Sequence, residues 1–432
     1  MNHSDLETLG FYEPGFLHLR VNTDLEISDL NSISRADPRL FSTFLHEYIH
    51  FIQNISTTSG LLDSILFIDF IKDVNWKIRT DGYPTFKVPV ALTAANNIKP
   101  NFDLSKIYRG DANGVNQVIY QGYHTEDVIV VDKESKSIIA KKFIVHYVDT
   151  NNRTPGRLHF GSTCLKEYIA HTIQREYLPT VKHPDIPYLL AEQIVLKECP
   201  SFGSDPSLIA SLCDASLMCL HPAQIFFASL ERIKRDKFVP TNLESVTRIV
   251  HDGLTFQGQG KVESIESLFI NSINLVDQQF FDALQSPQLL PNYNWIHHIL
   301  NQGRWLRLNR PNFISGLVQA EGVLSQEFYD IVHRLGTPFF TNNQNKGSFI
   351  PPEKFSDPAI QPYQALVFKE IIRVFNGKFD CQMFHFCKSR PDKDITNSKC
   401  QTSPWERATE PELCPFGQLW KTWGLVGETP VP

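Results

Sequence analysis

Several features that define other protein classes are missing from this sequence. No apolar run reaches the ~18 residues of a membrane-spanning helix, and residues 1–7 lack the basic start and apolar centre of a signal peptide. Lys and Arg form no run, because the 41 basic residues are interspersed with 47 acidic ones. The chain therefore offers no electrostatic surface for nucleic acid or an anionic membrane. These absences predict a cytoplasmic protein that has neither kind of partner.

Cysteine is also scarce. The eight cysteines in 432 residues are irregularly spaced and include no Cys-x-x-Cys pair. This pattern indicates thiols or metal ligands in a reducing compartment more than a disulfide scaffold. Four of them lie in the polar, turn-rich segment 378–432: Cys381, Cys387, Cys400 and Cys414. Clustered thiolates can hold a structural zinc ion, with His385 as a substitute ligand, but buried cysteines packed against tryptophan are the simpler interpretation.

The composition is that of a globular protein. With 42% hydrophobic and 12% aromatic residues, the chain can form the core of one large domain or of two to three ordinary ones. The residue patterns divide it into an N-terminal strand and helix (1–75), a loop with an antiparallel β insertion (76–160), a helical subdomain (161–377) and the cysteine-containing segment (378–432). We therefore predict an α+β fold that is mainly helical.

One helix carries the strongest chemical signal. Asp37 before Pro38 predicts a helix start, and the apolar residues that follow predict burial on several sides. From His46 to His50 the sequence reads H-E-x-x-H. Histidines four residues apart lie on one helical face and can bind one ion, while Glu47 can take a proton from a water that the ion activates. The alternative is that both are hydrogen-bonded core histidines and that the motif arises by chance.

A second predicted helix, 162–178 with Ser162 as its N-cap, contains a carboxylate that can complete this site. A catalytic zinc ion needs a third protein ligand and an open fourth position, and a carboxylate from a separate helix is an established solution. Glu167 and His171 share one face at four-residue spacing, and the apolar neighbours of Glu167 favour burial against the first helix. We rank Glu167 first as the third ligand, ahead of four alternatives: Glu176, His159, His146 and Asp214.

These two stretches resemble the gluzincin metallopeptidases, the thermolysin-like superfamily of zincins, in which a Glu on a downstream helix follows the pattern E-x-x-A-D. The resemblance covers 46–50 and the helix 162–178. It implies that His46, His50 and Glu167 hold zinc and that Glu47 is the general base. His171 stands where the family usually has Asp, and the resemblance implies that it supports a ligand from outside the metal's coordination.

The resemblance also implies a fold and a reaction. The fold is a zincin-like core, in which a small β-sheet and the active-site helix lie above a helical subdomain. The cofactor is one catalytic Zn²⁺, and the substrate is a protein or peptide. A Tyr or His from the helical subdomain stabilises the oxyanion in this superfamily, and the sequence leaves four candidates open: Tyr177, His297, His298 and Tyr363.

Other functional classes remain open. A zincin-fold protein can act in binding or regulation without turnover if loops at 79–114 or 336–358 block its cleft. A metal enzyme can instead hydrolyse a non-peptide amide or use iron. Glu47 to His50 is also half of a di-iron motif, but no second E-x-x-H occurs, so that alternative is minor. The oligomeric state is not predicted.

The remaining elements follow from periodicity and turn residues. We predict strands at 16–21, 117–124, 127–131, 137–149 and 157–161, with a hairpin turn at 132–135 and irregular structure over 79–114. Beyond the second apolar helix at 60–74 and the helix at 162–178, further helices are predicted at 188–197, 206–220, 223–236, 242–253, 262–284, 295–308, 314–335 and 360–376.

Overall fold

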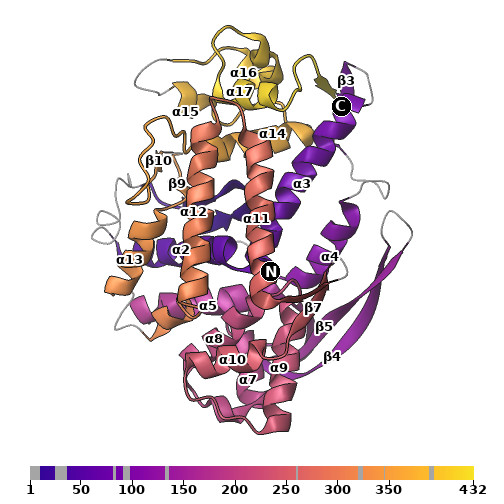
Figure 1. Cartoon of the computed structure of the whole chain (residues 1–432), viewed down its shortest axis with the longest axis vertical. Coiled ribbons are helices and arrows are strands. Elements are labelled where there is room, and N and C mark those ends of the chain that lie inside the picture. Colours follow the sequence, from indigo (N-terminus) through magenta and orange to yellow (C-terminus); the bar gives the residue numbers. More distant parts are fainter. Residues whose placement is uncertain are drawn as a thin grey trace.

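The computed structural model describes residues 10–24, 37–80, 84–90, 98–131, 136–258, 261–319, 325–344, 346–388 and 394–432. The fold is α+β and mainly helical, as predicted (Figure 1). The helices are α2 (Pro38–Ser56), α3 (Thr58–Thr80), α4 (Lys99–Arg109), α5 (Ser162–Tyr177), α6 (Asp185–Tyr188), α7 (Leu190–Glu198), α8 (Pro206–Leu217), α9 (Pro222–Asp236), α10 (Leu243–His251), α11 (Ile265–Leu284), α12 (Leu290–Asn309), α13 (Gln326–Leu335), α14 (Gln364–Phe375), α15 (Phe384–Lys388), α16 (Lys399–Thr402) and α17 (Pro415–Thr422). Short 3-10 helices are η1 (Pro14–Phe16), η2 (Pro200–Phe202), η3 (Ser315–Val318) and η4 (Pro404–Thr409).

The strands form small sheets. They are β1 (Gly10–Glu13), β2 (His18–Val21), β3 (Thr85–Lys87), β4 (Val118–Val131), β5 (Ser137–Asp149), β6 (Thr154–Phe160), β7 (Thr255–Gly258), β8 (Lys261–Ser264), β9 (Phe339–Thr341), β10 (Gly347–Ser348) and β11 (Thr429–Val431). The largest sheet has the order β1-β2-β9-β10, in which β2 and β9 are parallel. Its edge strand β1 lies against α2.

α2 crosses the middle of the molecule, behind α11 and α12 in the view of Figure 1. It starts as predicted, because the Asp37 side chain accepts a hydrogen bond from the Arg39 N–H at 2.8 Å and Pro38 occupies the first turn. α3, α5, α12 and β1 pack around it. Every residue from Leu40 to Ser56 except His50 is buried, which confirms the expected burial on several sides.

The predicted antiparallel meander is confirmed. β4, β5 and β6 form a three-stranded antiparallel sheet, in which the two strands expected at 117–124 and 127–131 are one strand with a bulge between Tyr120 and Gly122. The expected hairpin turn at 132–135 lies outside the described residues. The predicted strand at 16–21 begins only at His18, because Pro14–Phe16 forms a 3-10 turn.

The prediction of irregular structure over 79–114 was wrong for 79–80, 85–87 and 99–109, where α3 ends and β3 and α4 form. α4 has Pro100 in its first turn, where the missing N–H costs nothing. Ile107 of this helix packs against Val130 and Ala140 on the β4–β5 hairpin. Only one narrow stripe of α4 is buried, so its sequence lacks the broad apolar period of the other helices.

The later helices lie where the periodicity places them, with changes at the joints. The expected helix at 188–197 is α7 preceded by the short α6, and the one at 262–284 begins as strand β8. The expected helix at 314–335 is η3 followed by α13, and 320–324 lies outside the described residues. The segment 336–358, considered above as a loop, contributes β9 and β10 to the main sheet.

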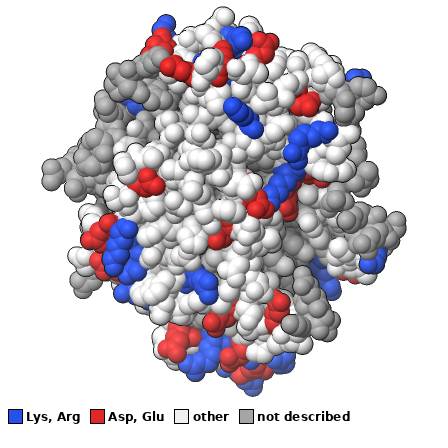
Figure 2. Space-filling model, turned by 45° about the horizontal axis from the view of Figure 1, so that its top comes forward, with Lys and Arg blue, Asp and Glu red and all other residues white. Residues whose placement is uncertain are grey.

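One apolar cluster runs from Leu17 to Leu425, so all four sequence segments contribute to the same core. The yellow C-terminal helices lie at one end of the molecule and α7 to α10 at the other (Figure 1). Figure 2 shows one face on which acidic and basic side chains are interspersed, mostly toward the rim, and neither sign dominates. Within the described residues, no helix is long and apolar enough to cross a membrane.

His221 joins the β4–β5 hairpin to the helical part. A hydrogen bond links its Nε2 to the Lys141 carbonyl at 2.7 Å, and its ring packs against Tyr108 of α4 at 4.6 Å between centroids. Burial lowers the pKa of His221 to about 4, with the positive charge of nearby His159 contributing less. Below an ordinary histidine pKa of about 6.5, the unfolded chain therefore takes up a proton that the folded chain does not.

We expect this difference to reduce the free energy of unfolding as the pH falls from about 6.5 toward 4. His221→Gln keeps a hydrogen-bond donor but cannot titrate. The decrease in the free energy of unfolding between pH 7 and pH 4.5, measured by urea unfolding, should therefore be smaller in the variant by about 2 kcal/mol. His385→Gln, at an exposed histidine, serves as the control. The same loss in His221→Gln and wild type would show that the pKa of His221 does not differ between the folded and unfolded chain.

Candidate metal centre

The structure brings together the three residues that the sequence predicts as ligands. His46 Nε2 lies 3.0 Å from Glu167 Oε2 and 3.1 Å from His50 Nε2, and His50 Nε2 lies 3.3 Å from the same Glu167 oxygen. In the part of the chain that the structure describes, no other group of three or more His, Cys, Asp or Glu side chains is close enough together to hold one metal ion. Both imidazoles come from α2 and the carboxylate comes from α5.

Close packing of α5 positions the carboxylate. Ala170, a small residue on α5, is completely buried. Gly161, not the predicted Ser162, is the N-cap, and it makes no side-chain cap hydrogen bond. A Cβ at Gly161 would lie 2.3 Å from the Arg109 carbonyl oxygen, so only glycine lets the end of α4 approach the start of α5 this closely.

The three side chains are strongly coupled by charge. Burial disfavours the ionised form of Glu167, but the charges and hydrogen bonds of His50 and His46 outweigh burial and hold its pKa well below the usual range. Burial alone would lower the pKa of His50, whereas the Glu167 carboxylate raises it to about 9. A carboxylate and a protonated imidazole therefore share the centre, and a metal cation would displace that proton.

The donor atoms fit a zinc ion. Ligand atoms about 2.0–2.1 Å from zinc in a tetrahedral arrangement lie about 3.3–3.4 Å from one another. The observed separations of 3.0, 3.1 and 3.3 Å are close to this spacing. Two imidazoles and a carboxylate are also a donor set of hydrolytic zinc enzymes.

Gln53 orients one of the ligands. Its Oε1 lies 2.9 Å from His50 Nδ1, so it accepts the Nδ1–H and leaves Nε2 to bind a metal ion that displaces its proton. Its Nε2 donates to the Lys166 carbonyl at 3.2 Å, which links this support to α5. Gln53 was not predicted from the sequence, although its position three residues after His50 places it on the same side of the helix.

His171 lies beside the centre, next to His183. Its buried Nδ1 has no hydrogen-bond partner, and its ring packs edge-on against His183 at 4.9 Å. Burial, followed by the charges of His183 and His46, lowers the pKa of His171 to about 3. His171 therefore contributes a neutral ring beside the centre, and Gln53 makes the supporting hydrogen bond.

Two further residues near the centre were not found from the sequence. The His183 ring stacks on His46 at 5.7 Å and on Tyr188 at 4.3 Å. Burial raises the pKa of Tyr188, and the charges of Glu167 and Glu47 raise it further. The four candidates for oxyanion stabilisation contact other parts of the chain: Tyr177, His297, His298 and Tyr363.

Glu47 lies between α2 and the edge strand. It is 8% exposed and accepts a hydrogen bond from the Tyr12 backbone N–H. A Cβ at Gly10 would lie 3.4 Å from Glu47 Cγ, which shows how closely β1 covers this side chain. Burial raises the pKa of Glu47, while the charges of His46 and His50 oppose the shift. A carboxylate with a raised pKa is suited to accept and release a proton near neutral pH.

The alternative ligands lie outside this group of three: Glu176, His159, His146 and Asp214. The C-terminal cysteines likewise form no ligand group among the described residues. Cys387, Cys400 and Cys414 are buried, and Cys400 Sγ accepts a hydrogen bond from Arg407 at 2.9 Å. Cys414 Sγ accepts one from the Gly417 N–H at 3.3 Å. These contacts favour packed cysteines over a structural zinc ion.

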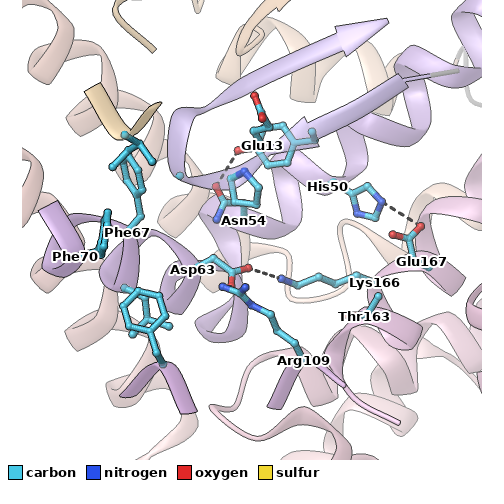
Figure 3. A pocket seen from close by; sticks show the side chains of 16 residues that line it. Glu13, His50, Asn54, Asp63, Phe67, Phe70, Arg109, Thr163, Lys166 and Glu167 are labelled. Carbon is cyan, nitrogen blue, oxygen red and sulfur yellow. Dashed lines mark hydrogen bonds and ion pairs between the residues drawn. The ribbon is translucent and has the colours of Figure 1, made fainter. Parts of the chain in front are cut away.

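A cavity of about 640 Å³ opens beside the centre. His50 and Glu167 line one part of it, and Phe67 and Phe70 of α3 line another (Figure 3). A substrate in this cavity would therefore contact the candidate ligands directly.

Searches against protein-family models, curated proteins and solved structures found no match to this chain.

Proposed function

We propose that this protein is a zinc-dependent metallopeptidase that hydrolyses peptide bonds in a protein or peptide substrate. The observation that supports the proposal is the convergence of His46, His50 and Glu167 at separations suited to zinc, with Glu47 next to the first ligand. The packing of β1 and α5 against α2 supports a zincin-like core of the gluzincin type.

Glu47 and Tyr188 have different roles in the proposed hydrolysis. A zinc ion held by His46, His50 and Glu167 would supply an acidified water and polarise the substrate carbonyl. Glu47 would accept a proton from the attacking water and deliver it to the leaving amine. The raised pKa of Glu47, caused by its burial, suits both transfers. Tyr188, whose ring centroid lies 5.9 Å from that of His46 and whose raised pKa keeps its hydroxyl protonated, is a candidate donor to the developing oxyanion.

The first test measures zinc content and peptide cleavage on the same samples. We expect about one zinc per chain in the wild type, and zinc-dependent cleavage of a mixed peptide library detected by mass spectrometry. His46→Ala should lose both zinc and cleavage, because it removes one of three protein donors. Cys400→Ala is the matched control and should keep both, since Cys400 lies outside the centre.

Each result has a different consequence. Zinc that survives His46→Ala would place the metal elsewhere and contradict the assignment of the ligands. A wild type that binds zinc but cleaves nothing in the library would contradict the peptidase. Cleavage that a chelator does not stop would show that hydrolysis does not depend on the metal.

A further inference from the structure

The cavity beside the metal centre combines two kinds of surface. Phe67 and Phe70 of α3 and Phe102 of α4 form an aromatic wall, in which the Phe70 and Phe102 rings meet edge-on at 6.3 Å. His50 and Glu167 lie across the cavity from the α3 phenylalanines (Figure 3). An apolar group of a substrate can pack on this wall while another part of the same molecule reaches the centre.

Two cations lie between these surfaces. Lys166 Nζ is 3.0 Å from Asp63 Oδ2, and the Arg109 Nε and Nη2 atoms are 2.9 and 2.7 Å from Asp63 Oδ1. Burial opposes ionisation of Asp63, but Lys166 and Arg109 outweigh burial and hold its pKa below the usual value. Asp63 is therefore ionised, and two positive charges face one negative charge. The group as a whole is positive.

The cations retain the capacity to bind an anion. Lys166 and Arg109 together carry about eight N–H donors, whereas Asp63 offers two oxygens. Lys166 is largely covered, Arg109 is about half exposed, and both line the cavity. The two other acidic groups in the wall are already paired: Glu13 with Lys369 at 2.8 Å and with His18 at 3.0 Å, and Glu167 with His46 at 3.0 Å and with His50 at 3.3 Å. The excess charge of this part of the cavity is thus positive.

We propose that Lys166 and Arg109 bind the C-terminal carboxylate of a peptide, with an aromatic or large aliphatic terminal side chain packed on Phe67, Phe70 and Phe102. This inference rests on the proposed peptidase function and makes the enzyme a carboxypeptidase. Lys166 directly precedes the candidate ligand Glu167 on α5, and both side chains line this cavity, so the bound carboxylate would share the cavity with the centre. The scissile bond is accordingly near the end of the substrate.

The test compares peptides that differ only at the C-terminus. Zinc-loaded protein is given one peptide ending in Phe as the free acid, as the amide, and as an amide with an internal Glu near its end. We expect kcat/KM for the free acid to exceed that for the amide by at least about tenfold, as hydrogen bonds to a charged group allow. If an acidic side chain is the recognised group, the Glu-containing amide is cleaved as fast as the free acid, and the proposal is overturned.

Variants identify the residues. Arg109→Gln and Lys166→Gln should each bring the ratio of kcat/KM for the free acid to kcat/KM for the amide toward one. Arg248→Gln, on the surface of α10, should not change this ratio. The free acid and the amide can be compared in the wild-type protein alone, so the proposal can still be tested if a variant does not fold. A ratio unchanged in correctly folded, zinc-containing Arg109→Gln and Lys166→Gln would overturn the role of these two residues.

A binding measurement separates this inference from the peptidase itself. Calorimetry on zinc-loaded Glu47→Gln should show N-acetylphenylalanine binding at least about tenfold tighter than its amide. Tighter binding of the acid without cleavage of any peptide would contradict the peptidase and retain the carboxylate site. Cleavage of peptides with equal binding of acid and amide would contradict the carboxylate site and retain the peptidase.

Discussion

Glu47→Gln should lower kcat for peptide hydrolysis by about 10²–10⁴-fold while leaving zinc bound. The amide has nearly the same shape as the carboxylate and can still accept the hydrogen bond from the Tyr12 N–H. It cannot take a proton from water. The three ligand atoms come from other residues, so the metal site should keep its affinity. Steady-state kinetics and elemental analysis on the same preparation measure both quantities.

The control for this variant is Glu176→Gln, at an exposed glutamate on α5, which should keep wild-type turnover. Loss of zinc in Glu47→Gln would indicate that Glu47 is itself a ligand. Full turnover with zinc bound would exclude it as the general base. If the protein acts by binding alone, the variant keeps its function, so this single change separates the peptidase from a zincin-fold binding or regulatory protein.

Predictions based on fixed helical geometry were accurate. Residues four apart on a helix face the same way whatever surrounds them, so His46 and His50 could be paired from their spacing alone. The α2 start followed from Asp37 and Pro38, which act within a single turn. Glu167 required one more step, namely that the apolar face of its helix packs against α2, and the structure shows these helices in contact.

Features that depend on distant pairing were missed. β9 has only three residues, too few to show the alternation of apolar and polar residues that predicts a strand. It forms a strand because it pairs with β2, more than 300 positions earlier in the chain. His183 lies in a proline-rich stretch without periodicity, and Tyr188 is the first residue of the helix predicted at 188–197. Only the folded chain places them beside His46. The cavity likewise needs α3, α4 and α5 together, so no local pattern could indicate it.

Asp214, an alternative metal ligand in the sequence, is instead half of a buried ion pair whose loss should strongly destabilise the fold. Arg307 binds both Asp214 oxygens, at 2.8 and 3.0 Å, and the two side chains are 2–4% exposed. Arg307 also donates to the carbonyl of Ser56, the last residue of α2, at 2.9 Å. The pair thus joins α8 and α12 to the end of the helix that carries the histidines.

Asp214→Ala would leave the Arg307 charge buried without a counter-ion, and we expect it to lower the free energy of unfolding by about 3–5 kcal/mol in urea titrations. The free energy of unfolding of a native protein is about 5–15 kcal/mol, so this change would be a large fraction of the total. Glu244→Ala, which breaks the exposed pair with Arg248, should cost less than about 1 kcal/mol.

The double variant Asp214→Ala/Arg307→Met distinguishes a buried charge from a simple loss of packing. Removing both charges removes the desolvated cation, so much of the stability lost in Asp214→Ala should return. If the double variant is less stable than the single one, the other Arg307 hydrogen bonds, including the one to the end of α2, outweigh the unpaired charge. In either case, the folded protein should still bind zinc, because Asp214 is not among the three candidate ligands. Loss of zinc from folded protein would instead indicate that Asp214 is a ligand.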